Sequence, residues 1–277
     1  MSLMLKLLST TLLLSSFLYA STAGENVAEF LQDKFSDNPR FQSVEVKVAD
    51  EIPLKELKGW DAYILDVSAY FKGKKSKPIK ERMIWFSNGK IITKDLVDMD
   101  SGLNLKELIR PHFKDKYYTK ANYLFGDLNA RHKIVIFSDP LCPFCRGFVP
   151  GALRDLKKEP KKFVVYYYHL PLTRLHPASK TLVKAAVAAE QQGNKNVIEK
   201  LYNVKVNFRE SDAKKILKAF NKAEGTNITL KDIQAPSVLK QVKADADMAN
   251  LLMVQGTPTL FLDGKIDNTK KKYLKAK

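Results

Sequence analysis

The sequence has 277 residues, a formal net charge of +17 at pH 7 and two cysteines. Two cysteines exclude a secreted scaffold that is held together by several disulfides. The basic charge could indicate a nucleic-acid-binding protein, but the lysines lie in short scattered clusters without a zinc-finger, ribonucleoprotein or helix-turn-helix pattern beside them. We therefore interpret the lysines as solvated surface and expect no nucleic acid partner.

The first residues have the pattern of a secretory signal peptide, which we assign to residues 1–20. Lys6 is the only charged side chain in this stretch, and an apolar run follows it. This run is shorter than the roughly 20 apolar residues that a membrane span needs, and an uncleaved anchor is the alternative. Cleavage can follow either Ala20 or Ala23. No later stretch approaches membrane length, so the pattern predicts a soluble, exported protein.

Residues 25–102 predict a small α+β domain. An amphipathic helix is expected over residues 27–35, closed by Asn38-Pro39. Asn88-Gly89 predicts a later hairpin turn, because this pair adopts positive φ at low cost. The edges of a small sheet need cover, so we expect this domain to form a homodimer. The strands are expected at residues 44–48, 63–71, 82–86 and 91–93.

A linker helix is predicted within residues 103–122. Leu105, Leu108 and Phe113 have the spacing of one helical face, and Pro111 interrupts the pattern. We expect this helix to connect the N-terminal domain to the remainder of the chain.

Residues 123–277 alternate between strand and helix patterns, which predicts one α/β domain. Its final segment enters a strand through Thr-Pro and leaves it through Asp-Gly, which is typical of a β-hairpin. We expect strands at residues 132–137 and 162–168, a helix at 145–158, a helical insertion at about 178–250 and the hairpin at 256–264.

Cys142-Pro143-Phe144-Cys145 follows an apolar strand, at the start of a predicted helix. Backbone N–H groups and the helix dipole favour a thiolate at Cys142, and we expect this thiol to be exposed and Cys145 to be more buried. Cys145 is close enough to attack a mixed disulfide on Cys142 and release the partner. A bridge across so short a loop removes little chain entropy, so it adds little stability. The pair therefore predicts reversible redox chemistry.

Two other interpretations of this cysteine pair are open. It could form half of a zinc site, which would need two histidines from elsewhere in the chain, or it could be an inert buried disulfide. Pro143 between the thiols, the preceding strand and export to an oxidising compartment argue against zinc, so we expect no metal ion. We interpret His169 and His176 as structural. The histidines available are His112, His132, His169 and His176.

Residues 137–145, with the sequence Phe-Ser-Asp-Pro-Leu-Cys-Pro-Phe-Cys, resemble the active-site segment of thioredoxin-fold proteins. The segment is closest to that of the periplasmic disulfide isomerases and reductases DsbC and DsbG. Residues 256–259, Gly-Thr-Pro-Thr, are similar to the loop in which that fold packs a cis-proline against its CxxC motif. His169-Leu170-Pro171-Leu172, followed by an alanine-rich helix, is similar to the helical insertion of the Dsb enzymes.

Three positions refine the resemblance. Thioredoxin and many DsbA-like oxidases carry a buried acid where this chain has Ile136, and DsbA-like oxidases more often have valine where it has Thr257. Both differences favour the isomerase and reductase group. Asp139 is nearer the cysteines, and we interpret it as a cap of the following turn.

The resemblance implies a thioredoxin-like catalytic domain over residues 123–277, preceded by a dimerisation domain and a linker helix. It implies that Cys142 is the nucleophile, that Cys145 resolves the mixed disulfide, and that Thr257 and Pro258 hold a substrate peptide as an added strand. Pro143 and Phe144 complete the motif. The redox-active disulfide would serve in place of any bound cofactor.

The implied protein is a periplasmic thiol–disulfide isomerase or reductase that acts on exported cysteine-containing proteins. A DsbD-like or DsbB-like membrane protein would be its redox partner. One alternative is a DsbA-like dithiol oxidase that donates its disulfide to substrates. Another, from a different class, is a holdase-type chaperone in which an apolar cleft binds unfolded chains and the thiols are secondary.

Overall fold

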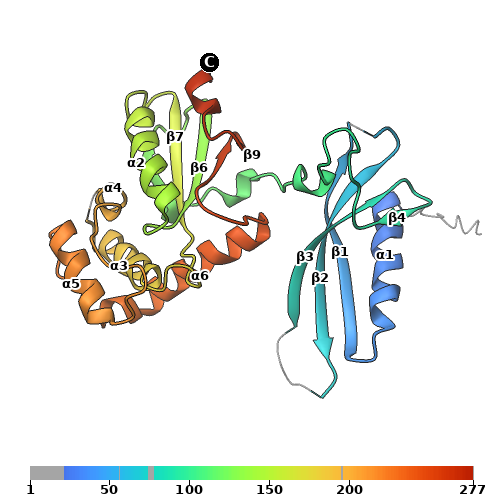
Figure 1. Cartoon of the computed structure of the whole chain (residues 1–277), viewed down its shortest axis with the longest axis horizontal. Coiled ribbons are helices and arrows are strands. Elements are labelled where there is room, and N and C mark those ends of the chain that lie inside the picture. The colour runs from blue at the N-terminus through green and yellow to red at the C-terminus, as the bar shows by residue number, and fades with distance from the viewer. Residues whose placement is uncertain (1–21, 56, 74–77, 195, 277) are drawn as a thin grey trace, which may run out of the picture. The chain divides into compact units, whose positions relative to one another are not determined.

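The computed structural model describes residues 22–55, 57–73, 78–194 and 196–276 (Figure 1). The predicted signal peptide, residues 1–20, lies outside these ranges. The chain divides into two compact units, Met1–Leu96 and Val97–Lys277. Within the described ranges, no helix combines the length and apolar character needed to cross a membrane.

The N-terminal unit is one helix on a four-stranded antiparallel sheet. The helix begins after Thr22, whose side chain accepts the Glu25 N–H while the Glu25 carboxylate accepts the Thr22 N–H, which is a capping box. Val27 and Leu31, one turn apart, are buried against alternate residues of the strands. The elements are α1 (Ala23–Ser36), β1 (Phe41–Pro53), β2 (Asp61–Phe71), β3 (Ile79–Ser87) and β4 (Ile92–Thr93), and the strands follow each other in that order across the sheet.

The hairpin predicted at Asn88-Gly89 is confirmed. Gly89 has a φ of +83°, and Ser87 at the end of β3 pairs with Ile92 at the start of β4. The Asn88 side chain holds the turn by accepting the backbone N–H groups of two later residues, Lys90 at 3.0 Å and Ile91 at 2.8 Å. The turn is therefore stabilised by the hydrogen bonds of the Asn88 side chain and by the positive φ that Gly89 can adopt.

The predicted linker helix is wrong. Residues 103–122 form three short 3₁₀ turns, Leu105–Glu107, Asp115–Tyr117 and Lys120–Asn122, in place of an α-helix. Pro111 has no N–H and disfavours the helical conformation of the residue before it. The Phe113 N–H makes no helical hydrogen bond and donates to the carbonyl of the distant residue Gly264 at 2.8 Å. The apolar spacing reflects burial of single side chains along an irregular segment.

The C-terminal unit is built on a mixed five-stranded sheet in the order β5-β7-β6-β8-β9. β6 is central, runs parallel to β7 and is antiparallel to β8 (Figure 1). Helix α2 connects β6 to β7, and a helical insertion lies between β7 and β8. The strands are β5 (Tyr123–Gly126), β6 (His132–Ser138), β7 (Phe163–His169), β8 (Thr259–Leu262) and β9 (Lys265–Ile266). The helices are α2 (Pro143–Lys157), α3 (Ser179–Gln191), α4 (Val197–Leu201), α5 (Ala213–Glu224) and α6 (Pro236–Leu251).

Both faces of this sheet are covered, which explains why β6 and β7 are continuous apolar runs. On one face, α2 and helices of the insertion, α3 among them, bury Ile134 and Ile136 in the larger core cluster. On the other face an aromatic cluster forms around Phe137, whose ring stacks on Tyr168 at 4.8 Å between centroids and contacts Phe261 at 6.0 Å. The central strand is thereby fixed at the point where it enters the cysteine motif.

Gly126 in β5 offers a test of the packing between β5 and β7. Its φ is +105°, and a Cβ there would lie 2.1 Å from the carbonyl oxygen of Phe163. We expect Gly126→Ala to lower the free energy of unfolding by more than about 3 kcal/mol, because backbone atoms would have to move. Gly225→Ala is the control, since Gly225 also has positive φ but open space around it, and should cost about 1 kcal/mol. Denaturant unfolding measures both, and equal losses would contradict the prediction.

Candidate active site at the cysteine motif

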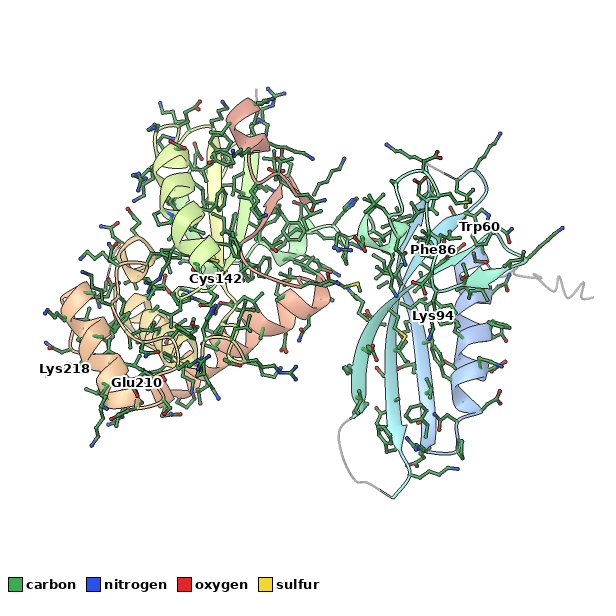
Figure 2. The ribbon with its side chains drawn as sticks, in the orientation of Figure 1. Trp60, Phe86, Lys94, Cys142, Glu210 and Lys218 are labelled. Carbon is green, nitrogen blue, oxygen red and sulfur yellow. The ribbon has the colours of Figure 1, made fainter. Side chains whose placement is uncertain are left out.

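The two cysteines lie where the central strand passes into helix α2. β6 ends at Ser138, a short turn follows, and Cys142 is the residue that caps the N-terminus of α2 (Figure 2). Pro143 occupies the first helical position, where its missing N–H costs nothing and its fixed φ suits the helix. Cys145 follows within the first turn. The sequence prediction of a strand–motif–helix arrangement is confirmed.

The expected exposure of Cys142 is wrong. Cys142 is 4% exposed and Cys145 is completely buried, whereas Phe144 between them is 78% exposed. The order of burial is as expected, but both thiols lie beneath the surface. The loop before β8 contributes to this burial, because the Cys142 thiol donates a hydrogen bond to the carbonyl of Thr257 at 3.4 Å.

The Thr257–Pro258 peptide bond is cis, which confirms the predicted conformation of this loop. Its position beside Cys142 follows from the sheet. β8 begins at Thr259, which pairs with Phe137 near the end of the antiparallel strand β6. The residues before β8 must therefore lie next to the residues after β6, and Thr257 meets Cys142 across a long sequence separation.

Cys145 is held in its neutral thiol form. Burial raises the pKa of the Cys145 thiol to about 11, while nearby hydrogen-bonding groups, led by the Ser138 hydroxyl, act in the opposite direction. The Thr257 hydroxyl also lowers this pKa; it is buried and makes no conventional hydrogen bond, which leaves it available to the sulfur. Ile136 is fully buried in the core of the same sheet, so this position contributes packing.

Asp139 holds the turn that carries the motif. Its carboxylate is fully buried, and each oxygen accepts a backbone N–H at 2.7 Å: Oδ1 from Leu141 and Oδ2 from Leu172. Oδ1 also accepts the Ser179 hydroxyl at 2.5 Å, and Oδ2 accepts Nδ1–H of His176 at 3.0 Å. The prediction that Asp139 caps the following turn is confirmed, and the carboxylate additionally joins that turn to the start of the helical insertion.

Arg146 supports the same turn from the helix. Its Nε–H donates to the carbonyl of Pro140 at 2.8 Å, and its Nη2–H donates to the carbonyl of Val204 at 2.8 Å. Burial lowers the pKa of the Arg146 guanidinium, and the charge of Asp139 opposes that shift. This residue could not be predicted from the sequence, because an arginine one position after a CxxC motif gives no signal of the carbonyls to which it will donate.

The interpretation of His169 and His176 as structural stays a prediction, and the structure shows the surroundings of three histidines. His132 Nδ1 lies 2.8 Å from a carboxylate oxygen of Asp263, and His176 Nδ1 lies 3.0 Å from a carboxylate oxygen of Asp139. His169 is 3% exposed and lies beside the ring of Tyr167, with 5.0 Å between centroids. Among the residues that the structure describes, no three His, Cys, Asp or Glu side chains are grouped so that they could hold a metal ion.

A family model described as Thioredoxin matches residues 118–276, the region that carries the CxxC helix and the cis-proline loop. This chain belongs to the thioredoxin family. The expected α/β, thioredoxin-like domain with its helical insertion is therefore confirmed.

Curated relatives include the Na(+)/H(+) antiporter NhaA 1 of Mycobacterium sp. (strain KMS). It is 29% identical over 152 residues, which are 53% of this chain and 24% of the antiporter. The antiporter NhaA 3 of Salinispora tropica is 27% identical over 148 residues, which are 52% of this chain and 22% of that protein. This chain thus spans about a quarter of the length of the curated relatives it matches.

Similar solved structures include BdbD from Bacillus subtilis in its oxidised form, with a TM-score of 0.48, 19% identity, and coverage of 60% of this chain and 97% of that one. A putative protein-disulfide isomerase from Pseudomonas syringae has a TM-score of 0.48, 14% identity, and coverage of 56% and 97%. A periplasmic thioredoxin-like protein from Salmonella enterica serovar Typhimurium has a TM-score of 0.44, 24% identity, and coverage of 54% and 82%.

Replacing Asp139 tests whether its carboxylate holds the motif. Each oxygen accepts a backbone N–H, so an amide turned either way would leave one of these N–H groups facing an NH₂ donor. We expect Asp139→Asn to lower the free energy of unfolding by about 1–3 kcal/mol, the cost of a buried donor without an acceptor.

The control for Asp139→Asn is Asp247→Asn. Asp247 pairs with Lys243 on the exposed surface of α6, so its replacement should change stability by less than about 1 kcal/mol. Denaturant unfolding of the two variants provides the comparison. Equal stability of both variants would show that the Asp139 hydrogen bonds do not hold the turn.

Proposed function

We propose that this protein is an exported thiol–disulfide oxidoreductase that exchanges disulfides with other exported proteins through Cys142 and Cys145. The observation that supports this most is the position of Cys142 at the N-terminus of α2, with its sulfur 3.4 Å from the Thr257 carbonyl of the cis-proline loop. Helix N-terminal N–H groups stabilise a thiolate, and the loop offers backbone groups beside it to an extended peptide.

Catalysis proceeds by two thiol–disulfide exchanges. The Cys142 thiolate attacks a substrate disulfide, forms a mixed disulfide and releases one substrate thiolate, which takes up a proton. Cys145 then loses its proton, bonds to the Cys142 sulfur and displaces the second substrate thiolate. The substrate gains two electrons and two protons, and the enzyme is left with a Cys142–Cys145 disulfide. The same steps in reverse donate a disulfide to a substrate.

Exposed apolar side chains around the motif suit an unfolded polypeptide as the substrate. Phe144 projects from the motif, and Leu175 and Phe208 are also exposed, at 64% and 45%. Phe208 contacts the ring of His176, which is bonded to Asp139 beneath the motif. These side chains offer a surface to chains that have not yet buried their own apolar residues.

Within this class we favour a disulfide isomerase or reductase of the DsbC/DsbG type, supported by Thr257 before the proline and by Ile136 in place of a buried acid. A DsbA-like dithiol oxidase is the second candidate, since it would use the same two cysteines. The signal-peptide pattern supports a periplasmic location, where a DsbD-like or DsbB-like membrane protein would set the redox state of the pair. A holdase-type chaperone would need only the apolar surface, without either thiol.

The two cysteines should behave differently in a trapping experiment. Without Cys145 the mixed disulfide on Cys142 cannot be resolved, so Cys145→Ala should accumulate disulfide-linked adducts with exported proteins. Cys142→Ala, the matched control, should form almost none because Cys145 is completely buried. Non-reducing electrophoresis of periplasmic extracts measures the adducts. Equal trapping by the two variants would contradict the assigned roles, and aggregation suppression by a variant lacking both cysteines would favour the chaperone.

The N-terminal unit should hold a homodimer. Its sheet has one edge partly closed, since the Val46 N–H of β1 donates to the Gln32 side chain at 3.1 Å. At the other edge β4 pairs with β3 at Phe86 and Ser87, so most of β3 extends beyond it. A second copy can complete such an edge. Light scattering of the intact mature protein should give the mass of two chains, whereas a monomer at micromolar concentration would favour the DsbA-like oxidase.

A further inference from the structure

Three buried hydroxyl groups form a hydrogen-bonded chain in the core that contains Cys145. Tyr167 on β7 and Tyr202, the residue after α4, hold their hydroxyl oxygens 2.7 Å apart. Tyr202 donates to Oγ of Ser138 at 2.7 Å, and the Ser138 hydroxyl at the end of β6 lowers the pKa of the Cys145 thiol, which is buried in the same core. Ser138 and Cys145 are completely buried, and the tyrosines are 4% and 6% exposed.

The direction of this chain follows from the number of hydrogens. Each hydroxyl group has one to donate. Tyr202 uses its hydrogen on Ser138, so the hydrogen between the two tyrosines belongs to Tyr167. The hydrogen of Ser138 is then available to the sulfur of Cys145. All three hydroxyl dipoles point toward the thiol, and hydrogen bonds in such a chain polarise one another.

The thiolate of Cys145 requires stabilisation by hydrogen-bond donors because its sulfur is buried. Only a thiolate attacks a disulfide, yet a fully buried sulfur has lost the water that would stabilise its negative charge. Burial accordingly raises the pKa of Cys145 to about 11. Oriented donors can replace the lost hydration without placing a second charge in the core.

We propose that Ser138 is a catalytic residue that stabilises the thiolate of Cys145, and that Tyr202 and Tyr167 are positioning residues that act through it. The inference rests on the proposed function, because it concerns the second exchange. In that step the Cys145 sulfur bonds to the Cys142 sulfur, and the bond from Cys142 to the substrate breaks. The leaving sulfur takes the electron pair of the broken bond and a proton, which balances the proton lost by Cys145.

Other groups face Cys145 and affect its ionisation. In the reduced protein a negative charge on Cys142 raises the pKa of Cys145, and this charge is absent once Cys142 is in the mixed disulfide. The Thr257 hydroxyl and the backbone of Asp139 lower the pKa of Cys145. The Asp139 carboxylate also faces Tyr202, whose pKa burial raises. All of these groups stay in place when a hydroxyl of the chain is removed, so a change in the second exchange can be attributed to that hydroxyl.

The test is a single turnover with glutathione disulfide. Reduced protein is mixed with an excess of this disulfide and quenched in acid at a series of times. Mass spectrometry then separates the reduced protein, the mixed disulfide and the internally bridged form. The two rates, measured across a range of pH, report attack by Cys142 and resolution by Cys145 separately.

Tyr202→Phe should slow the resolution step about threefold at neutral pH and leave the attack by Cys142 unchanged. A rise of one pKa unit lowers the thiolate fraction about tenfold, and the greater nucleophilicity of a more basic thiolate restores about threefold of that loss. The pH profile of resolution should also move upward by about one unit. A purely structural role of Tyr202 would not move this profile. Ser138→Ala, which removes the donor itself, should have the larger effect.

Tyr168→Phe is the matched control. Tyr168 is the neighbour of Tyr167 on β7, but it packs in the aromatic cluster on the other face, where its hydroxyl donates to the carbonyl of Tyr117 at 2.7 Å. Its removal should leave both exchange rates and the pH profile unchanged.

The outcomes separate the inference from the proposed function. If mixed disulfide forms and both Tyr202→Phe and Ser138→Ala resolve it with the wild-type rate and pH profile, the chain has no catalytic role and the proposed function stands. If the unaltered protein forms no mixed disulfide, the proposed function fails and the inference fails with it. Should Tyr202→Phe not fold, as judged by thermal unfolding, Ser138→Ala decides the question alone.

Discussion

The antiparallel pairing of β8 with β6 is the constraint on which the candidate site depends. β6 delivers the chain into the cysteine motif, and β8 receives it from the cis-proline loop, so the pairing of Phe137 with Thr259 brings both to the same end of the sheet. Strand pairing fixes register, because a slip of one residue would turn every side chain to the opposite face. The contact between Cys142 and the Thr257 carbonyl is therefore a consequence of sheet register.

A second element of the site is the turn between β6 and α2, which is fixed by hydrogen bonds of buried side chains. Asp139 accepts hydrogen bonds from its own turn, from the segment after β7 and from the start of α3. The guanidinium of Arg146 adds a bond to the carbonyl of Pro140. A buried carboxylate whose hydrogen bonds are all made resists displacement, because breaking any one of these bonds leaves a donor unpaired in the core. The helix N-terminus and its thiols are fixed by this arrangement, while Phe144 remains at the surface.

Burial divides the work between the two cysteines in the proposed reaction. Cys142 lies at the cap of α2, against the cis-proline loop, and in the proposed reaction it is the sulfur that attacks the substrate disulfide. Cys145 is enclosed by an apolar core, and the side chains that lower its pKa are uncharged hydroxyl groups. An uncharged donor chain stabilises a transient thiolate yet costs less to bury than an ionised group when the thiol is protonated. This arrangement suits a group that needs to ionise only while a mixed disulfide is present.

Elements whose signals are local could be predicted from the amino-acid sequence. The apolar run of β6, the CxxC motif at a helix start, the Asn88-Gly89 turn and the Thr-Pro entry to β8 each carry their structure in a few residues, and the structure has them as predicted. Local spacing failed at residues 103–122, where Leu105 and Phe113 are buried by an irregular segment and Pro111 prevents the helix that their spacing suggests.

The groups that surround the thiols could not be predicted in this way, because packing between distant elements brings them together. Ser138 is one residue after a predicted strand, and Tyr167 and Tyr202 are ordinary aromatic residues in the sequence. They meet because β6 lies beside β7 and because the insertion returns α4 to the same core. Hydrogen bonds between side chains far apart in the sequence depend on how the elements pack, and no local pattern encodes that packing. The burial of Cys142 has the same origin, since the loop that covers it is contributed by the far end of the domain.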